Sequence, residues 1–221
     1  MEKLSKLTWW KWLTMGLLVY TIIGALLFEV PRLQILNETI RNLYFHVPMW
    51  FGMTFLFLAS MVYAIKYLSG NDLKYDVYSS ELAKIGLLFG MLGLVTGMVW
   101  AKFTWGAYWS NDSKQNASAI GMLLYLALFI LRGSVQDDQQ KARLSAVYNI
   151  FAFSILFPLL FIIPRLTDSL HPGNGGNPGF NAYDLDSKLR PVFYPAVIAW
   201  TFLGFWIASL KIRFKKLMIH E

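Results

Sequence analysis

Cysteine is absent from the 221 residues of this chain. Without a thiol the chain can form no disulfide framework, no CxxC redox pair, no iron–sulfur site and no cysteine-ligated zinc site. It also lacks any CxxCH motif, so it cannot itself hold haem through thioether bonds. Any chemistry that this chain performs must therefore use other side chains.

Charged residues are scarce, at 15% of the chain, whereas hydrophobic residues make up 56%. Soluble domains contain about 25% charged and 45–50% apolar residues. A water-soluble core of this size could not hide so much apolar surface. About 20 apolar residues cross a bilayer, and six segments approach that length: 9–28, 47–68, 82–101, 117–131, 144–163 and 192–210. We therefore predict an all-α polytopic membrane protein, a six-transmembrane-helix bundle that forms a single integral membrane domain over residues 1–221.

The basic residues are distributed unevenly between the two sides of the predicted bundle. The two terminal segments and the loops between spans two and three and between spans four and five hold 13 of the 20 Lys and Arg residues. The alternate loops, 29–46, 102–116 and 164–191, hold seven. The positive-inside rule therefore places both termini in the cytoplasm and these alternate loops outside. Because the charges flank the spans, the net charge of +7 gives no support to a nucleic-acid partner.

Ionisable side chains are missing from the middle of every predicted span. Such residues mark proton relays and ion paths, so their absence argues against a pump or an ion-coupled transporter. The chain also has no GxxxxGK[ST] loop for ATP and no evident catalytic motif. We therefore expect a non-enzymatic protein whose chemistry lies in its outward loops.

Two of the three histidines fall on the same predicted outer face. His46 stands where the first outer loop meets the second span, and Pro48 suits the first turn of that helix. His171 lies beside Pro172 in the long fifth loop. Two neutral imidazoles that face each other can occupy both axial positions of a haem iron. The alternatives are an interfacial His46 and a solvated His171, whereas His220, on the opposite face, is expected to have no ligand role.

The third outer loop is rich in aromatic residues. If it is helical, Trp105, Trp109 and Asp112 share one face, and Lys114 follows. That face would form an aromatic shelf for a planar macrocycle, with a cation for its propionates. The alternative is an aromatic belt that marks the depth of the lipid headgroups.

Two segments resemble a known family. The pattern Trp-Gly-x-Tyr-Trp-x-x-Asp-x-Lys of residues 105–114 resembles the tryptophan-rich WWD segment of haem-handling proteins of cytochrome c biogenesis. Tyr-x-His-Val-Pro, residues 44–48, resembles the helix start of the cytochrome c maturation protein C family, also called haem exporter protein C. Asn111 stands where that family usually has Trp.

The resemblance implies a haem-binding site at the periplasmic face of a bacterial inner membrane. Its metal ligands would be His46 and His171. The platform beneath the porphyrin would comprise Trp105, Gly106, Tyr108, Trp109 and Asp112. The cofactor would be haem b, held non-covalently and transiently, and passed to a periplasmic haem chaperone. An ATP-binding cassette complex of the same maturation system would help to release the loaded chaperone.

Two other functions remain open. A b-type electron-transfer cytochrome usually buries its haem ligands inside the spans, and no span interior here contains His. A permease would need mobile helices, which Pro158, Pro164 and the series Gly86, Gly90, Gly93, Gly97 could provide. The glycine spacing is more typical of close helix packing, so we interpret span three as having a small-residue face.

Overall fold

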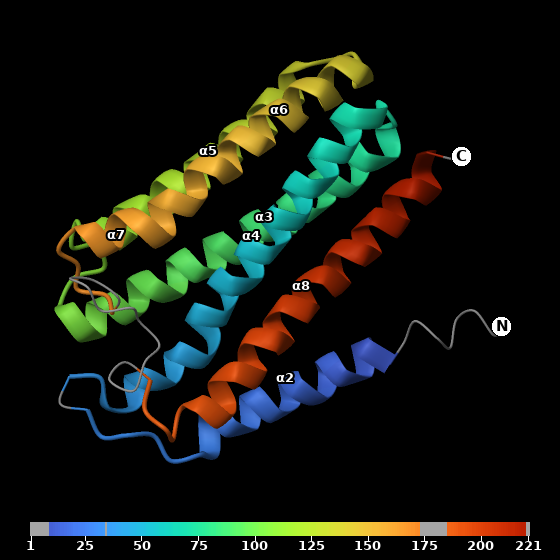
Figure 1. The fold of residues 1–221 in the computed structure, drawn as a ribbon. Coiled ribbons are helices and arrows are strands. Elements are labelled where there is room, and N and C mark those ends of the chain that lie inside the picture. Colours follow the sequence, from blue (N-terminus) through green and yellow to red (C-terminus); the bar gives the residue numbers. More distant parts are fainter. Residues whose placement is uncertain (1–8, 34, 173–184, 220–221) are drawn as a thin grey trace.

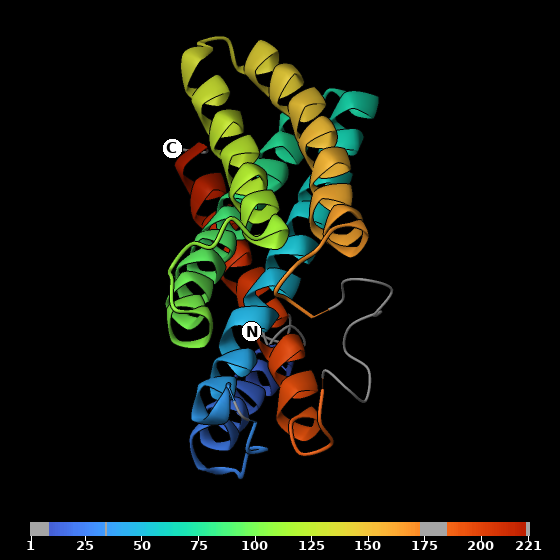
Figure 2. The same ribbon diagram turned by 90° about the vertical axis from the view of Figure 1, so that its left-hand side faces the viewer.

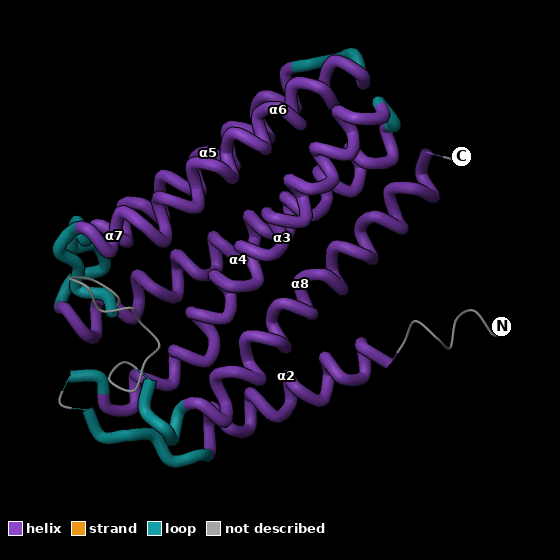
Figure 3. The backbone as a smooth tube through the Cα atoms, viewed as in Figure 1, coloured by secondary structure: helices purple, strands orange, loops and turns teal. Residues whose placement is uncertain are grey.

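The computed structural model describes residues 9–33, 35–172 and 185–219, and within these ranges every regular element is helical (Figures 1 and 3). His220 and Gly173–Gly176 lie outside the described residues. The elements are α2 (Trp9–Leu27), the 3-10 helix η1 (Asn37–Asn42), α3 (Leu43–Gly70), α4 (Leu73–Trp105), α5 (Ser113–Ser134), α6 (Asp138–Phe157), the π-helical turn η2 (Pro158–Ile162), α7 (Ile163–Leu166) and α8 (Arg190–Ile219).

Six helices are long and apolar enough to cross a membrane, which confirms the predicted fold class. Except for α2, they extend beyond the predicted apolar runs, because they begin or end in polar turns that hydropathy does not register. The fourth span, predicted as 117–131, runs over Ser113–Ser134. Its first turn contains Lys114, Gln115 and Asn116, which are polar but helical.

Aspartates start three of the helices. The side chains of Asp72, Asp112 and Asp137 accept hydrogen bonds from the first free backbone N–H groups of α4, α5 and α6. Asn71 ends α3 and Gly106 ends α4, and both adopt the left-handed conformation. These N-caps and left-handed C-caps are the usual way to stop one helix and begin the next within a short loop.

The helix α3 lies at the centre of the bundle. It packs against α4, α6 and α8, while α2 packs against α8 at the periphery. The paired helices α5 and α6 lie on the opposite side of α3 and α4 from α2 (Figures 1 and 2). The first residues of α2 and the last residues of α8 lie at the same end of the bundle, as expected if both termini share a side of the membrane (Figure 1). Which side that is stays a prediction.

The glycines of α4 form the small-residue face that the sequence predicted. A Cβ atom added at Gly93 would come within 3.0 Å of the Trp50 ring, and one at Gly97 within 2.6 Å of the His46 ring. Gly86 and Gly90 are equally close to side chains of the core. The stripe therefore lets α4 approach α3, and its last members accommodate a tryptophan and a histidine.

Candidate functional site

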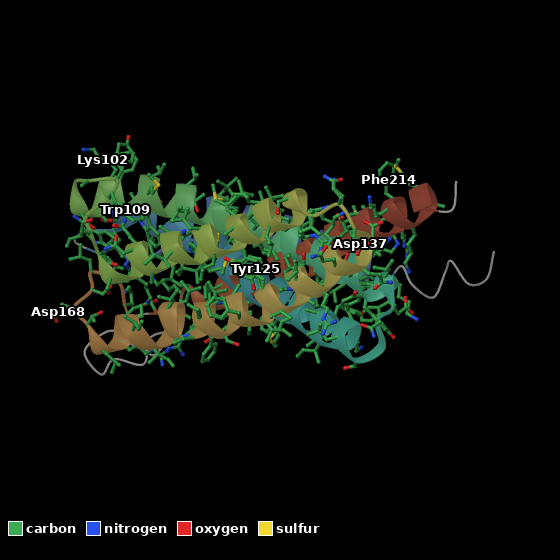
Figure 4. The ribbon with its side chains drawn as sticks, turned by 90° about the horizontal axis from the view of Figure 1, so that it is seen from above. Lys102, Trp109, Tyr125, Asp137, Asp168 and Phe214 are labelled. Atoms are coloured by element: carbon green, nitrogen blue, oxygen red, sulfur yellow. The ribbon has the colours of Figure 1, made fainter. Side chains whose placement is uncertain are left out.

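A cavity of about 450 Å³ lies at the end of the bundle opposite the described helix ends that lead to the termini. Ligand pockets typically measure about 300–1,000 Å³. Five site candidates from the sequence line it: His46, Trp105, Trp109, Lys114 and His171. Figure 4 places Trp109 at the same end as Asp168 and far from Asp137. The cavity thus joins α3, the α4–α5 loop and the segment that follows α7.

His46 occupies the first turns of α3 and is 9% exposed. Its Nδ1 lies 2.9 Å from the Gly93 carbonyl oxygen and 3.2 Å from the Thr96 hydroxyl oxygen. The Thr96 hydroxyl donates back to carbonyls of its own helix, so both neighbours act as acceptors toward Nδ1–H. This leaves Nε2 as the basic ring nitrogen, and it has no hydrogen-bond partner in the described part of the chain. The expected position at the helix start is confirmed, but the side chain is buried rather than exposed.

Tryptophans flank the His46 ring. The rings of Trp50 and Trp100 meet it edge to face, with centroids 6.2 and 5.9 Å away. Trp100 is itself fixed, because its Nε1–H donates to the Thr39 hydroxyl at 3.2 Å. Both tryptophans also line the cavity. The imidazole is therefore held in one orientation by α3, α4 and η1 together.

The predicted place of Pro48 in the first turn of its helix is wrong. α3 begins at Leu43, directly after the 3-10 helix Asn37–Asn42, so Pro48 lies in the second turn. Proline has no N–H, so the Tyr44 carbonyl cannot accept the usual bond from the residue four positions later. The 3-10 helix leads directly into α3, so α3 begins earlier in the chain than the position of Pro48 indicated.

Asp112 connects the start of α5 to the segment that carries His171. Its Oδ1 accepts from His171 Nδ1 at 2.8 Å and from the α5 backbone, and its Oδ2 accepts from the Ser169 hydroxyl at 2.8 Å and the Leu170 N–H at 2.7 Å. The carboxylate side chain is 1% exposed. Burial alone would raise its pKa, but the hydrogen bonds from His171, Leu170 and Ser169 outweigh burial and hold the pKa well below its ordinary value.

The Asp112 contact fixes the tautomer of His171. A neutral imidazole whose Nδ1–H donates to a carboxylate presents Nε2 as its basic nitrogen. That ring also meets Trp105 edge to face, with centroids 4.8 Å apart. The His171 side chain is 24% exposed, so it is more accessible than His46. Both histidines therefore use Nδ1 for support and keep Nε2 for another partner.

The predicted helical shelf over residues 105–112 is wrong. α4 ends at Trp105 because Gly106 takes a left-handed conformation (φ 83°), and Asn111 does so too (φ 54°). The segment is a loop between two caps. Asn tolerates positive φ better than Trp does, which suits Asn111 at a position where the sequence departs from the family pattern.

The end of α4 and the loop that follows nevertheless bring two tryptophans to the cavity. Trp105 and Trp109 line it, and Trp109 Nε1–H donates to the Asn116 side chain at 3.1 Å. Gly106 does not line the cavity and serves as the C-cap of α4. Tyr108 is 55% exposed and also lies outside the lining.

Several lining residues were not singled out from the sequence as site residues. Trp50 was detectable, because it follows His46 by four positions on the same helix face. Trp100 gave no signal separate from the aromatic belt. Two cations also line the cavity: Lys114, which was expected beside the aromatic shelf, and Arg165, which was not. Lys114 Nζ donates to the Pro172 carbonyl at 2.9 Å. Most of the remaining lining side chains are apolar.

The fold and the pocket together define a class of protein: a six-helix membrane protein whose largely apolar cavity is lined by two histidines, each with its Nδ1 in a hydrogen bond. Comparison with known proteins gives the family. The chain belongs to the heme exporter protein C family, whose sequence model matches residues 2–218.

Curated relatives carry the same description. The chain is 30% identical to heme exporter protein C of Bradyrhizobium diazoefficiens over 169 residues, 76% of this chain and 63% of that protein, so the match spans less than two thirds of that relative. It is 26% identical to heme exporter protein C of Haemophilus influenzae over 220 residues, 99% of this chain and 86% of that protein. It is 21% identical to the Escherichia coli protein of the same name over 78% of this chain and 66% of that protein.

Proposed function

We propose that this protein binds haem in the two-histidine cavity and presents it to an acceptor protein during cytochrome c maturation. The family supports a role in haem handling for that process. The observation that carries the finer proposal is that His46 and His171, from opposite parts of the chain, line one cavity with both Nδ1 atoms engaged by acceptors. Each ring thus offers Nε2, the nitrogen that an axial haem ligand uses when Nδ1 is engaged.

The lining fits a porphyrin in chemistry as well as in position. Tryptophans at 50, 100, 105 and 109 supply flat apolar surface for a macrocycle. Lys114 and Arg165 supply positive charge of the kind that pairs with propionates. Two basic residues of the other outer loops are engaged elsewhere: Arg41 donates to the Ala25 and Phe28 carbonyls at the end of α2, and Lys188 pairs with Glu29. The absence of cysteine supports non-covalent binding, and haem b is the group that we propose.

The protein acts as a carrier and not as an enzyme in this proposal. Haem is its cargo, and the chain supplies two ligands, an apolar wall and a pair of cations. The covalent chemistry belongs to the partner, a periplasmic haem chaperone, and an ATP-binding cassette complex releases the loaded chaperone. The proposed setting is the bacterial inner membrane, with both termini in the cytoplasm and the cavity at the periplasmic face.

The absorption spectrum of the detergent-purified protein tests the assignment. Reconstitution with haem should give a low-spin, six-coordinate spectrum in the wild type. His46→Ala and His171→Ala should each lower haem recovery and lose that signature, and the double variant should bind least. His220→Ala is the matched control and should behave as the wild type does. Wild-type haem recovery and an unchanged spectrum in both single variants would contradict the proposal.

A further inference from the structure

A second hollow lies on the outer surface of the bundle, between α3 and α8, and is separate from the haem cavity. It measures about 820 Å³ and runs from Phe55 to Lys66 along α3 and from Val197 to Phe205 along α8. Nearly all of its wall is hydrocarbon. At 1.5 Å per residue the α3 side is about 16 Å long, which is about half the 30 Å hydrocarbon thickness of a bilayer. The groove therefore has about the length of one leaflet.

The groove ends on a cluster of lysines and tyrosines, at the end of the bundle away from the haem cavity. Lys66 Nζ lies 5.1 Å from the centre of the Tyr63 ring, and both residues line the groove. Tyr63 stacks on Tyr78 with ring centroids 4.9 Å apart. Lys216 lies 4.5 Å from the Tyr78 ring centre and donates to its hydroxyl at 2.6 Å. Two ammonium groups from α3 and α8 are thus joined through a pair of stacked rings.

The cluster carries an excess of positive charge. A third lysine, Lys74, lies 4.8 Å from the Tyr75 ring, but it is paired with Asp72 at 2.6 Å. The next carboxylate of α4, Asp76, is bound by Arg132 from α5. Lys66 has no carboxylate partner among the residues that the structure describes. The mouth of the groove therefore offers cations without a matching anion.

We propose that this groove binds one anionic phospholipid, with an acyl chain along α3 and α8 and the phosphate beside Lys66, the lysine that lines the groove, while Lys216 adds positive charge from the other side of the stacked tyrosines. Basic sites between transmembrane helices bind such headgroups. The length of one leaflet and the charged end both match a lipid.

Native mass spectrometry of the full chain in detergent tests the site. The probes are palmitoyl-oleoyl phosphatidylglycerol and the phosphatidylcholine with the same chains. The wild type should retain the anionic lipid preferentially. At about 1 kcal/mol for each lysine near a headgroup, Lys66→Gln with Lys216→Gln should weaken phosphatidylglycerol binding about thirtyfold and abolish the preference. Lys215→Gln, at the same helix end but outside the cluster, is the matched control. It should keep the wild-type binding of phosphatidylglycerol and the preference for it over phosphatidylcholine.

A second variant tests the apolar part independently of charge. Val62→Trp fills the groove from its exposed side and should lower the retention of both lipids, while far-UV circular dichroism confirms that the helices persist. Equal retention of the two lipids by the wild type would overturn the proposal. So would an equal loss of phosphatidylglycerol in Lys215→Gln, which would indicate diffuse surface charge. A wild-type dimer that Val62→Trp converts to a monomer would make the groove a protein interface and would also overturn it.

Discussion

Asp112 is the residue whose substitution tests the proposed haem site most sharply. It accepts hydrogen bonds from five donors, which include the first free N–H groups of α5 and the Nδ1 of His171. Asp112→Asn preserves the shape and the N-cap preference but removes the charge and one acceptor. Whichever way the amide turns, its NH₂ faces a group that donated to the carboxylate. The orientation that keeps Oδ1 on His171 costs the bond from the Leu170 N–H.

The magnitude follows from the contacts. A hydrogen bond to a charged group contributes about 1.5–3 kcal/mol and a neutral one about 0.5–1.5 kcal/mol. The support of the His171 ring therefore weakens by about 1.4 kcal/mol, which corresponds to a factor of about ten in affinity. Removal of a carboxylate that supports a ligating histidine typically lowers metal affinity about 10- to 100-fold. The expected loss, about tenfold, agrees with this in order of magnitude. Asp112→Ala removes the cap as well, so it should lose more haem affinity and about 1 kcal/mol of helix stability.

Haem titration followed by absorbance measures the affinity, and thermal unfolding in the same detergent measures the stability. Asp112→Asn should bind haem about tenfold more weakly while its melting temperature changes less than that of Asp112→Ala. Asp137→Asn is a matched control, because that aspartate caps α6 at the far end of the bundle. If Asp112→Asn binds haem as the wild type does, the carboxylate does not support a ligand and the reasoning is refuted.

Three further results are expected. Because the pKa of Asp112 is lowered on folding, its carboxylate stabilises the protein above its ordinary pKa and loses that effect as the pH falls toward the lowered value. The gap in melting temperature between wild type and Asp112→Asn should therefore hold from about pH 5 to 7 and narrow progressively below about pH 4. Gly97→Ala would push on the His46 ring and should cost about 1–3 kcal/mol and haem affinity, whereas Gly16→Ala, with open space around it, should not destabilise the protein. Asn149→Ala removes two buried interhelical hydrogen bonds and should lower stability by about 1 kcal/mol with haem affinity unchanged.

The membrane fold could be predicted from the sequence because the bilayer imposes its own rule. Each crossing of the membrane needs a long apolar run. The sequence shows six such runs, and the structure has six helices that are long and apolar enough to span a membrane. The glycine stripe of α4 was also predictable, since small residues four apart lie on one helix face. Helix ends were not, because capped polar turns such as the one after Asp112 carry no hydropathy signal.

The site was only partly predictable, for a different reason. His46 and His171 could be assigned to one face of the membrane, but hydropathy gives no distance between two loops. The contact between Asp112 and His171 joins residues far apart in the chain and depends on how α5 begins and how α7 ends. The conformation of residues 106–112 depends on two left-handed residues, so a helical pattern of aromatics was misleading there.

The two candidate ligands are held by different kinds of structure, and this difference bears on how haem would leave. The ring of His46 is enclosed by α3 and α4, where Gly97 and two tryptophans leave it little room to turn. The His171 ring is more exposed and depends on Asp112, which holds a short segment after α7 against the start of α5. A carrier must release its cargo, and local opening begins where fewest buried contacts hold the chain. In the proposed function, therefore, the acceptor protein gains access to haem from the side of His171, while His46 keeps its place in the bundle.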